Sequence, residues 1–138
     1  MKTNTTARFF IVYLLPVALW ALCIFILSSI PITQKIKLPF PHFDKVVHFF
    51  EYGILGFFMS RALYNHPVKI LKKYFLLFSI IFCCIFAAVD EFHQIYIPGR
   101  SESLVDFFTD FFGILIAQIP FYVRSIHDAT AKSKKSPF

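Results

Sequence analysis

The segment DEFHQIYIPGRSESLVD, residues 90–106, gathers most of the polar chemistry of an otherwise apolar chain. It lies between two apolar runs, FLLFSIIFCCIFAAV and FFGILIAQIPFYV. Pro98 fixes φ and Gly99 can adopt positive φ, so the Pro-Gly pair predicts a tight turn. The flanking runs are therefore predicted to form two neighbouring helices that the segment joins.

The composition indicates a membrane protein. The 138 residues are 57% hydrophobic and 16% charged, and the mean hydropathy is +0.65. One soluble domain of this size could not bury so much apolar surface, whereas a helix that crosses a bilayer needs about 20 mostly apolar residues. The sequence offers four such stretches, at roughly 9–30, 46–64, 74–97 and 104–123. We therefore expect an all-α membrane protein, a bundle of four transmembrane helices.

The distribution of Lys and Arg predicts the orientation of this bundle. With the N-terminus inside, ten of these residues fall on the inner side and four on the outer side, namely Lys35, Lys37, Lys45 and Arg100. Because basic residues favour cytoplasmic loops, this bias predicts an N-in, C-in topology and accounts for the net charge of +6 without a nucleic-acid partner. The expected organisation is a cytoplasmic N-terminus (1–8), a membrane domain (9–124) and a basic, mobile cytoplasmic tail (125–138).

Several local signals refine the helices. Residues 9–30 are too long for a signal-peptide core and lack a small-residue cleavage site, so they are expected to stay as a helix. Pro16 inside this helix is tolerated if a neighbouring helix or water bonds the carbonyl that it frees. Asp44 is expected to cap the second helix and Ser103 the fourth. The cysteines lie in apolar runs without metal-site spacing and are expected to pack: Cys23, Cys83 and Cys84.

Polar residues share one face at the outer end of each of three predicted helices, because residues three, four or seven apart lie on one side of a helix. The three sets are Asp44, His48 and Glu51; Asp90, His93 and Gln94; and Ser103, Asp106 and Asp110. An ionised carboxylate that faces lipid costs several kcal/mol, on the order of the insertion scales. These faces should therefore turn inward and form an outward-opening polar pocket.

Three pieces of sequence resemble the VanZ-like family of small bacterial membrane proteins, which is named after a protein linked to teicoplanin resistance. They are SSIP (28–31), DKVVHFFEYGILG (44–56) and DEFHQIYIPGRSESLVDFFTDFFG (90–113). The family pattern falls on Asp44, Lys45, His48, Tyr52, Asp90, Glu91, Gln94, Pro98, Gly99, Arg100, Ser103, Asp106 and Gly113. Asp110 stands where the family more often has Asn. The resemblance implies a multi-pass protein of the bacterial cytoplasmic (inner) membrane, tied to glycopeptide tolerance, and supplies no mechanism.

Binding is the function that we expect for the pocket, because it needs complementarity and no nucleophile. Its partners would be membrane lipids, and its ligand an envelope lipid headgroup, a lipid-linked cell-wall precursor or a glycopeptide. The candidate binding residues are Asp44, Lys45, His48, Glu51, Tyr52, Asp90, Glu91, Gln94, Arg100, Ser103, Asp106 and Asp110.

Two other hypotheses remain open. In a membrane hydrolase or transferase, the candidate catalytic residues are His48, Asp90, Glu91 and His93, with Lys45 and Arg100 as a phosphate clamp. The sequence has no nucleophile, Walker or HExxH motif, so enzymatic activity is not assigned. Alternatively, the polar residues only hold the helices together.

A metal site is a variant of the enzyme hypothesis. The atoms for a mixed His/carboxylate site are present in His48, Glu51, Glu91, His93 and Asp106. Glu91 and His93 are two residues apart on a helix and point in different directions. The sequence therefore assigns no metal and no cofactor.

Overall fold

The computed structural model describes residues 5–31, 42–100 and 104–135, and every regular element in these ranges is a helix. The fold class predicted from the sequence, all-α, is confirmed for this part of the chain. In order, the elements are α1 (Thr5–Phe9), the π-helical turn η1 (Phe10–Leu14), α2 (Leu15–Ser28), α3 (Phe43–Tyr64), α4 (Lys69–Lys73), α5 (Phe75–Gln94), α6 (Leu104–Ala117) and α7 (Ile119–Lys135).

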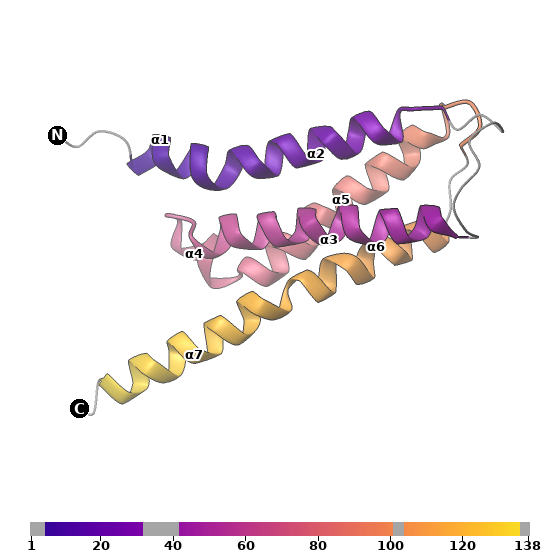
Figure 1. Ribbon diagram of the computed structural model, residues 1–138. Helices are drawn as coiled ribbons and strands as arrows, with labels where there is room; N and C mark the ends of the chain where they lie inside the picture. Colours follow the sequence, from indigo (N-terminus) through magenta and orange to yellow (C-terminus); the bar gives the residue numbers. More distant parts are fainter. Residues whose placement is uncertain (1–4, 32–41, 101–103, 136–138) are drawn as a thin grey trace.

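The long helices run alongside one another, and α3 is the central one (Figure 1). It packs most extensively against α6 and also contacts α5 and α2. The C-terminal ends of α2 and α5 and the N-terminal ends of α3 and α6 meet at one end of the bundle, on the right in Figure 1. Residues that are far apart in the sequence are thereby brought to one end.

Three helical stretches in the described residues are long and apolar enough to cross a membrane: Thr6–Ser28, Phe75–Gln94 and Leu104–Lys134. The fourth predicted span, α3, has 22 residues, which corresponds to about 33 Å of helix. It also carries four charged residues, Asp44, Lys45, Glu51 and Arg61, so composition alone does not mark it as a span. The four-span count and the orientation therefore remain predictions.

Pro16 divides the first helix in the way that its chemistry requires. Its nitrogen has no hydrogen to donate to the carbonyl of Val12, four residues earlier. Just before it, the chain widens into η1, where the N–H of Leu15 bonds the carbonyl of Phe10. Arg61 of α3 donates from Nη1 to the oxygen of Val12 at 3.1 Å. A neighbouring helix thus satisfies the freed carbonyl, as predicted.

Glycines allow α3 and α6 to approach each other closely. A Cβ atom on Gly113 would lie 2.3 Å from the carbonyl oxygen of Phe49 in α3, a distance that real Cβ atoms do not adopt. A Cβ on Gly56 would lie 3.2 Å from the Cα of Ile114. The close approach of α3 and α6 therefore depends on the absence of a side chain at Gly113 and Gly56.

Two apolar groups fill the bundle. The larger contains Ile24, Tyr52, Leu55, Cys83, Ala87 and Ile114. The smaller contains Leu63, Phe75 and Phe121. The three cysteines are free thiols, and Cys83 is fully buried, in agreement with the packing role predicted for them.

Some helix ends differ from the predictions. Asp44 does not cap α3: His42 precedes that helix with a φ of 64°, and Asp44 lies inside the first turn, next to Lys45. The predicted cap Ser103 lies outside the described residues. The third helix ends at Gln94 rather than near residue 97, and Gly99 adopts a φ of 81° in the turn that follows. The tail that we expected to be mobile is helical through Lys135.

Candidate functional site

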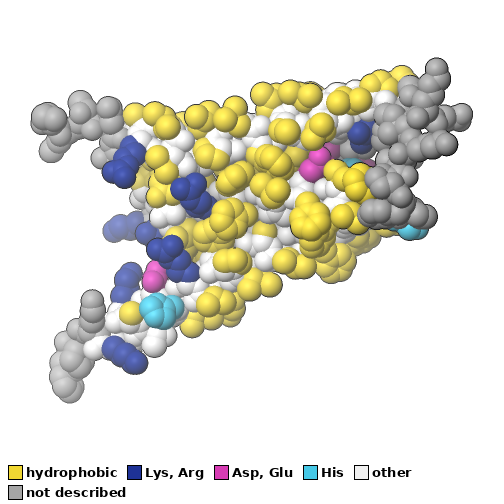
Figure 2. All heavy atoms as spheres, in the orientation of Figure 1, with side chains coloured by type: hydrophobic (Ala, Val, Ile, Leu, Met, Phe, Trp, Pro, Cys, Tyr) yellow, Lys and Arg dark blue, Asp and Glu magenta, His cyan; other side chains and the backbone are white. Residues whose placement is uncertain are grey.

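Seven buried polar residues gather where four helices meet, and we call them the acidic cluster. They come from α2, α3, α5 and α6, and each residue as a whole is at most 8% exposed: Ser28, His48, Asp90, Glu91, Gln94, Asp106 and Asp110. Figure 2 shows acidic side chains toward this end, whereas most Lys and Arg side chains in view lie at the other end. Burial of so many polar groups is costly unless they bind one another or a ligand.

Asp90 is held by two helices. Ser28 of α2 donates from its hydroxyl to Asp90 Oδ1 at 2.5 Å, and Gln94 donates from Nε2 to Oδ2 at 3.0 Å. Asp90 and Gln94 are four residues apart, so they share one face of α5, as the sequence spacing predicts. Asp90 is only 2% exposed and faces the bundle interior.

Arg100 links this network to the C-terminal end of α2. Its Nη1 donates to Gln94 Oε1 at 3.2 Å. Its Nη2 and Nε donate to the carbonyl oxygens of Leu27 and Ile30 at 2.9 and 3.2 Å. A guanidinium at this position satisfies carbonyls that the helix end leaves open and suits the negative end of the helix dipole.

Lys45 forms the rim of the cluster. Its ammonium donates to Asp44 at 2.9 Å and to Asp106 of α6, and thereby ties the first turns of α3 and α6 together. The side chains of Lys45, Asp44 and Asp106 are 24%, 37% and 11% exposed. Lys45 and Arg100 thus bind separate partners, and the rim is the accessible part of the arrangement.

His48 and Asp110 form the floor of the cluster. His48 Nδ1 lies 3.2 Å from Asp110 Oδ1. Glu91 joins them from α5, so that one ligand atom from each of these three side chains lies within 4.8 Å of the others. Tyr52 stacks nearly parallel to His48, with 6.4 Å between ring centroids and an interplanar angle of 9°. A nitrogen and two carboxylates from three helices are donors that could hold a metal ion.

Not every candidate residue joins the cluster. His93 turns toward α2, where its Nε2 lies 3.0 Å from the Ser29 hydroxyl and its ring stacks on Phe25. Glu51 is half-buried and lies within electrostatic reach of His48, Asp90 and Arg100. Of the two histidines among the candidate catalytic residues, only His48 therefore lies in the acidic cluster.

Sequence reasoning missed Ser28 and a second buried polar group. Ser60, Ser79 and Gln118 bond one another: the two hydroxyls are 2.9 Å apart, Ser60 Oγ donates to Gln118 Oε1 at 2.5 Å, and Gln118 Nε2 donates to Ser79 Oγ at 3.1 Å. Ser79 and Gln118 are single polar residues within apolar runs, and Ser60 follows an apolar run directly before Arg61. Spacing along one helix gives no signal for them, because their partners lie on other helices.

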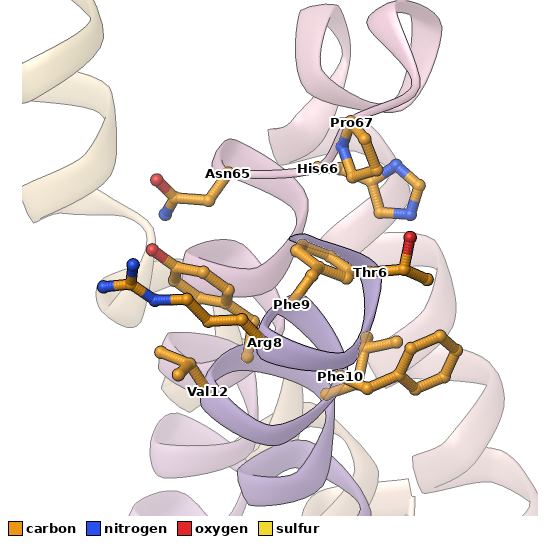
Figure 3. A pocket seen from close by; sticks show the side chains of 10 residues that line it. Thr6, Arg8, Phe9, Phe10, Val12, Asn65, His66 and Pro67 are labelled. Carbon is orange, nitrogen blue, oxygen red and sulfur yellow. The ribbon is translucent and has the colours of Figure 1, made fainter. Parts of the chain in front are cut away.

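Two hollows among the described residues lie away from the acidic cluster. A cavity of about 580 Å³ at the other end of the bundle is lined by Thr6, Arg8, Phe9, Phe10, Val12, Tyr13, Leu14, Asn65, His66 and Pro67 (Figure 3). An apolar groove of about 300 Å³ runs between α3 and α6, along Phe50, Gly53 and Phe57.

Long apolar helices around a buried acidic cluster are typical of one class, the helical membrane proteins. The family model described as VanZ/LLP1 matches residues 5–124, and the chain belongs to this family. The predicted family membership is thereby confirmed. Comparison with curated proteins found no match, and comparison with solved structures found none.

Proposed function

We propose that this VanZ/LLP1 protein crosses the bacterial cytoplasmic membrane four times, with both termini in the cytoplasm. The charges of the described residues support this orientation, because basic residues favour the cytoplasmic side. The end formed by α1, α4 and α7 carries Arg8, Arg61, Lys69, Lys72, Lys73, Arg124, Lys132 and Lys134. The opposite end carries Lys45 and Arg100. The acidic cluster then faces the extracytoplasmic leaflet.

We propose that the acidic cluster binds the polar headgroup of an envelope lipid or of a lipid-linked cell-wall precursor. The observation that carries this proposal is the partly exposed rim of Asp44, Lys45 and Asp106 above the buried floor of His48 and Asp110. A headgroup at the rim would exchange the Lys45 ion pairs for its own, while its acyl chains lay against the apolar outer faces of the helices.

The charge of the cluster favours a headgroup that carries an amine. Six carboxylates among the described residues belong to this end, against Lys45 and Arg100: Asp44, Glu51, Asp90, Glu91, Asp106 and Asp110. A phosphate alone would add negative charge to this excess, whereas an ammonium or hydroxyl donor complements it. Phosphatidylethanolamine and the amine-bearing peptide of a cell-wall precursor match this chemistry, and so does a glycopeptide with a free amine.

Native mass spectrometry of the purified protein tests the proposal. Phosphatidylethanolamine and lipid II should stay bound where phosphatidylglycerol is lost. Asp90→Asn and Asp106→Asn should abolish this retention, whereas Asp128→Asn, on exposed α7, should preserve it. Expression should raise teicoplanin tolerance, and the same two variants should remove that effect. Unchanged lipid retention and unchanged tolerance in both variants would contradict the proposal.

A second candidate function is hydrolysis or transfer on a lipid-linked substrate. The contact that favours it is the 3.2 Å pair of His48 Nδ1 and Asp110 Oδ1, the geometry of a general base and the carboxylate that orients it. Nanodisc-embedded protein, incubated with lipid II and phospholipids with and without divalent metal, should then yield products by mass spectrometry that disappear in His48→Ala. No product from wild-type protein across this panel would exclude the candidate.

A further inference from the structure

We propose that His48, Glu91 and Asp110 bind one divalent transition-metal ion where α3, α5 and α6 meet. The proposal goes beyond headgroup binding, because it requires no headgroup in the site. One nitrogen or oxygen atom from each of the three side chains lies within 4.8 Å of the others. The side chains come from three different helices, so the tertiary packing, rather than local spacing, brings these donors together.

The donors lie somewhat farther apart than the ligands of a bound ion and must close in to hold one. Zinc lies about 2.0–2.2 Å from nitrogen and oxygen ligands, so two ligands of one tetrahedral ion are about 3.3–3.6 Å apart. The donors, which lie within 4.8 Å of one another, must therefore approach by up to about 1.5 Å to bind one ion. Rotations about the side-chain bonds of Glu91 and His48, which are 8% and 7% exposed, would supply this approach.

Two buried atoms point independently to a missing ligand. Asp110 is 0% exposed, and its Oδ2 has no hydrogen-bond partner among the described residues. The Tyr52 hydroxyl is equally buried and interacts electrostatically with Asp90, Glu91 and Asp110, but it makes no hydrogen bond of ordinary geometry in the described part of the chain. Buried polar atoms in native proteins nearly always have a partner. A metal ion would bind Oδ2, and a carboxylate or water on the ion would accept the Tyr52 hydrogen.

The balance of charge around His48, Glu91 and Asp110 also favours a bound metal ion. The two cations at this end of the described structure have other partners: Lys45 pairs with Asp44 and Asp106, and Arg100 bonds Gln94 and backbone carbonyls. A divalent ion would add positive charge beside the carboxylates of Glu91 and Asp110, the second of which already contacts His48, in a region where excess negative charge is costly. Because an imidazole is among the donors, Zn²⁺, Mn²⁺ or Fe²⁺ suits the set better than Mg²⁺ or Ca²⁺.

The chain offers matched controls for this site. Glu51 and His93 have the same functional groups as Glu91 and His48 and lie toward the same end of the bundle. They do not share the close-packed set of donor atoms formed by His48, Glu91 and Asp110. If a substitution acted only by removing a negative charge or an imidazole, metal affinity would fall equally in the Glu91 and Glu51 variants and equally in the His48 and His93 variants. If it removes a metal ligand, metal affinity should fall only in the Glu91 and His48 variants.

The full-length protein, stripped with a chelator in nanodiscs and then equilibrated with Mn²⁺ or Zn²⁺, gives the test. Elemental analysis should find about one ion per chain. Glu91→Gln and Asp110→Asn should each weaken binding by at least about tenfold, the scale seen when metal sites lose supporting contacts. The metal affinities of Glu51→Gln and His93→Ala should stay within about twofold of the wild-type affinity. No stoichiometric ion in wild-type protein, or equal losses in the controls, would overturn the proposal.

A spectroscopic measurement on wild-type protein removes dependence on variants that fold poorly. Pulsed electron paramagnetic resonance of the Mn²⁺-loaded chain should show coupling to one imidazole nitrogen. The coupling should persist in His93→Ala and vanish in His48→Ala. Bound Mn²⁺ without a nitrogen coupling in the wild type would show that the ion sits elsewhere and would refute the site. Both experiments measure the metal ion and not lipid retention. A negative result would therefore contradict the metal site without contradicting headgroup binding, which lipid retention tests separately.

Discussion

Gly113 is the residue at which the packing of α3 and α6 is most easily tested. Gly113→Ala would place a Cβ atom 2.3 Å from the Phe49 carbonyl oxygen, so the helices must separate. We expect the free energy of unfolding to fall by about 1–3 kcal/mol, the range of overpacked sites. Unfolding in mixed micelles, followed by circular dichroism, measures the change.

Gly53→Ala is the matched control for this substitution. Its Cβ would lie 3.5 Å from the Gly113 oxygen, an ordinary contact. Since alanine is the better helix former by about 0.5–1 kcal/mol, Gly53→Ala should leave stability equal or slightly higher. Equal destabilisation by the two substitutions would mean that helix separation at Gly113 does not limit stability.

At the residue scale, the sequence predicts pairs on one helix better than pairs between helices. The Asp90–Gln94 bond follows from a spacing of four, so the sequence alone is enough to expect it. The bond from Ser28 to the same carboxylate joins residues 62 apart in sequence, and nothing in the local pattern indicates it. For the same reason, the sequence did not indicate Asp110 as a metal donor, although it lies against His48.

At the scale of the elements, the stability of the first helix depends on α3, because Arg61 of α3 bonds the Val12 carbonyl. Because Pro16 donates no hydrogen, Arg61→Ala would leave the Val12 carbonyl unsatisfied, and we expect a loss of about 1–3 kcal/mol in the free energy of unfolding. In a Pro16→Ala background, the N–H of residue 16 can bond Val12, so the same substitution should cost less than about 1 kcal/mol. A double-mutant cycle in micelles measures the difference.

The aromatic contact of Arg61 needs its own control in that cycle. Its guanidinium also lies 5.0 Å from the centroid of the Tyr13 ring. Tyr13→Leu removes this contact and leaves the bond to Val12 in place. If Arg61→Ala were equally costly with proline or alanine at position 16, then the bond to the Val12 carbonyl would not be what Arg61 contributes to stability.

The bonds of Gln118 connect the end of α6 to α3 and α5. Gln118→Leu removes its bonds to Ser60 and Ser79, while the two serines can still bond each other. Polar contacts between membrane helices contribute about 0.6–2 kcal/mol, so we expect a loss in that range. Ser125→Ala, at a partly exposed serine that bonds only its own helix backbone among the described residues, is the control and should change stability by less than about 0.5 kcal/mol. Equal losses would show that the buried group contributes nothing specific.

Element boundaries were harder to predict than the existence of the helices. The run SIHDATAKSKK suggested a mobile tail because it is polar, yet α7 continues through Lys135. Its alanines and lysines favour a helix, and a helix already begun upstream avoids the cost of a new nucleus. Polarity indicates exposure to water, which a surface helix also satisfies, so it could not distinguish the two outcomes.

At the scale of the whole molecule, hydropathy predicted the helical bundle, and the spacing of polar residues predicted that acids from several helices would gather at one end. The spacing could not predict how the polar residues at this end divide into separate bonded groups. The Lys45–Asp106 pair, the Ser28–Asp90–Gln94–Arg100 chain and the His48–Asp110 contact depend on how the helices rotate against one another. That rotation is set in part by the glycine contacts between α3 and α6. These contacts depend on how the two helices pack and cannot be derived from the spacing of residues within one helix.

The orientation of the bundle decides which side of the membrane supplies ligands to the acidic cluster, and it can be tested directly. Tyr96→Cys and Ala131→Cys place single thiols at exposed positions at opposite ends, in a background with Cys23, Cys83 and Cys84 replaced by alanine. A membrane-impermeant maleimide should label Tyr96→Cys in intact cells and Ala131→Cys only after permeabilisation, because basic residues favour the cytoplasmic side. Labelling of Ala131→Cys in intact cells would place the basic end outside. The acidic cluster would then take its ligand or its metal ion from the cytoplasm, and a direct role in extracellular glycopeptide tolerance would be untenable.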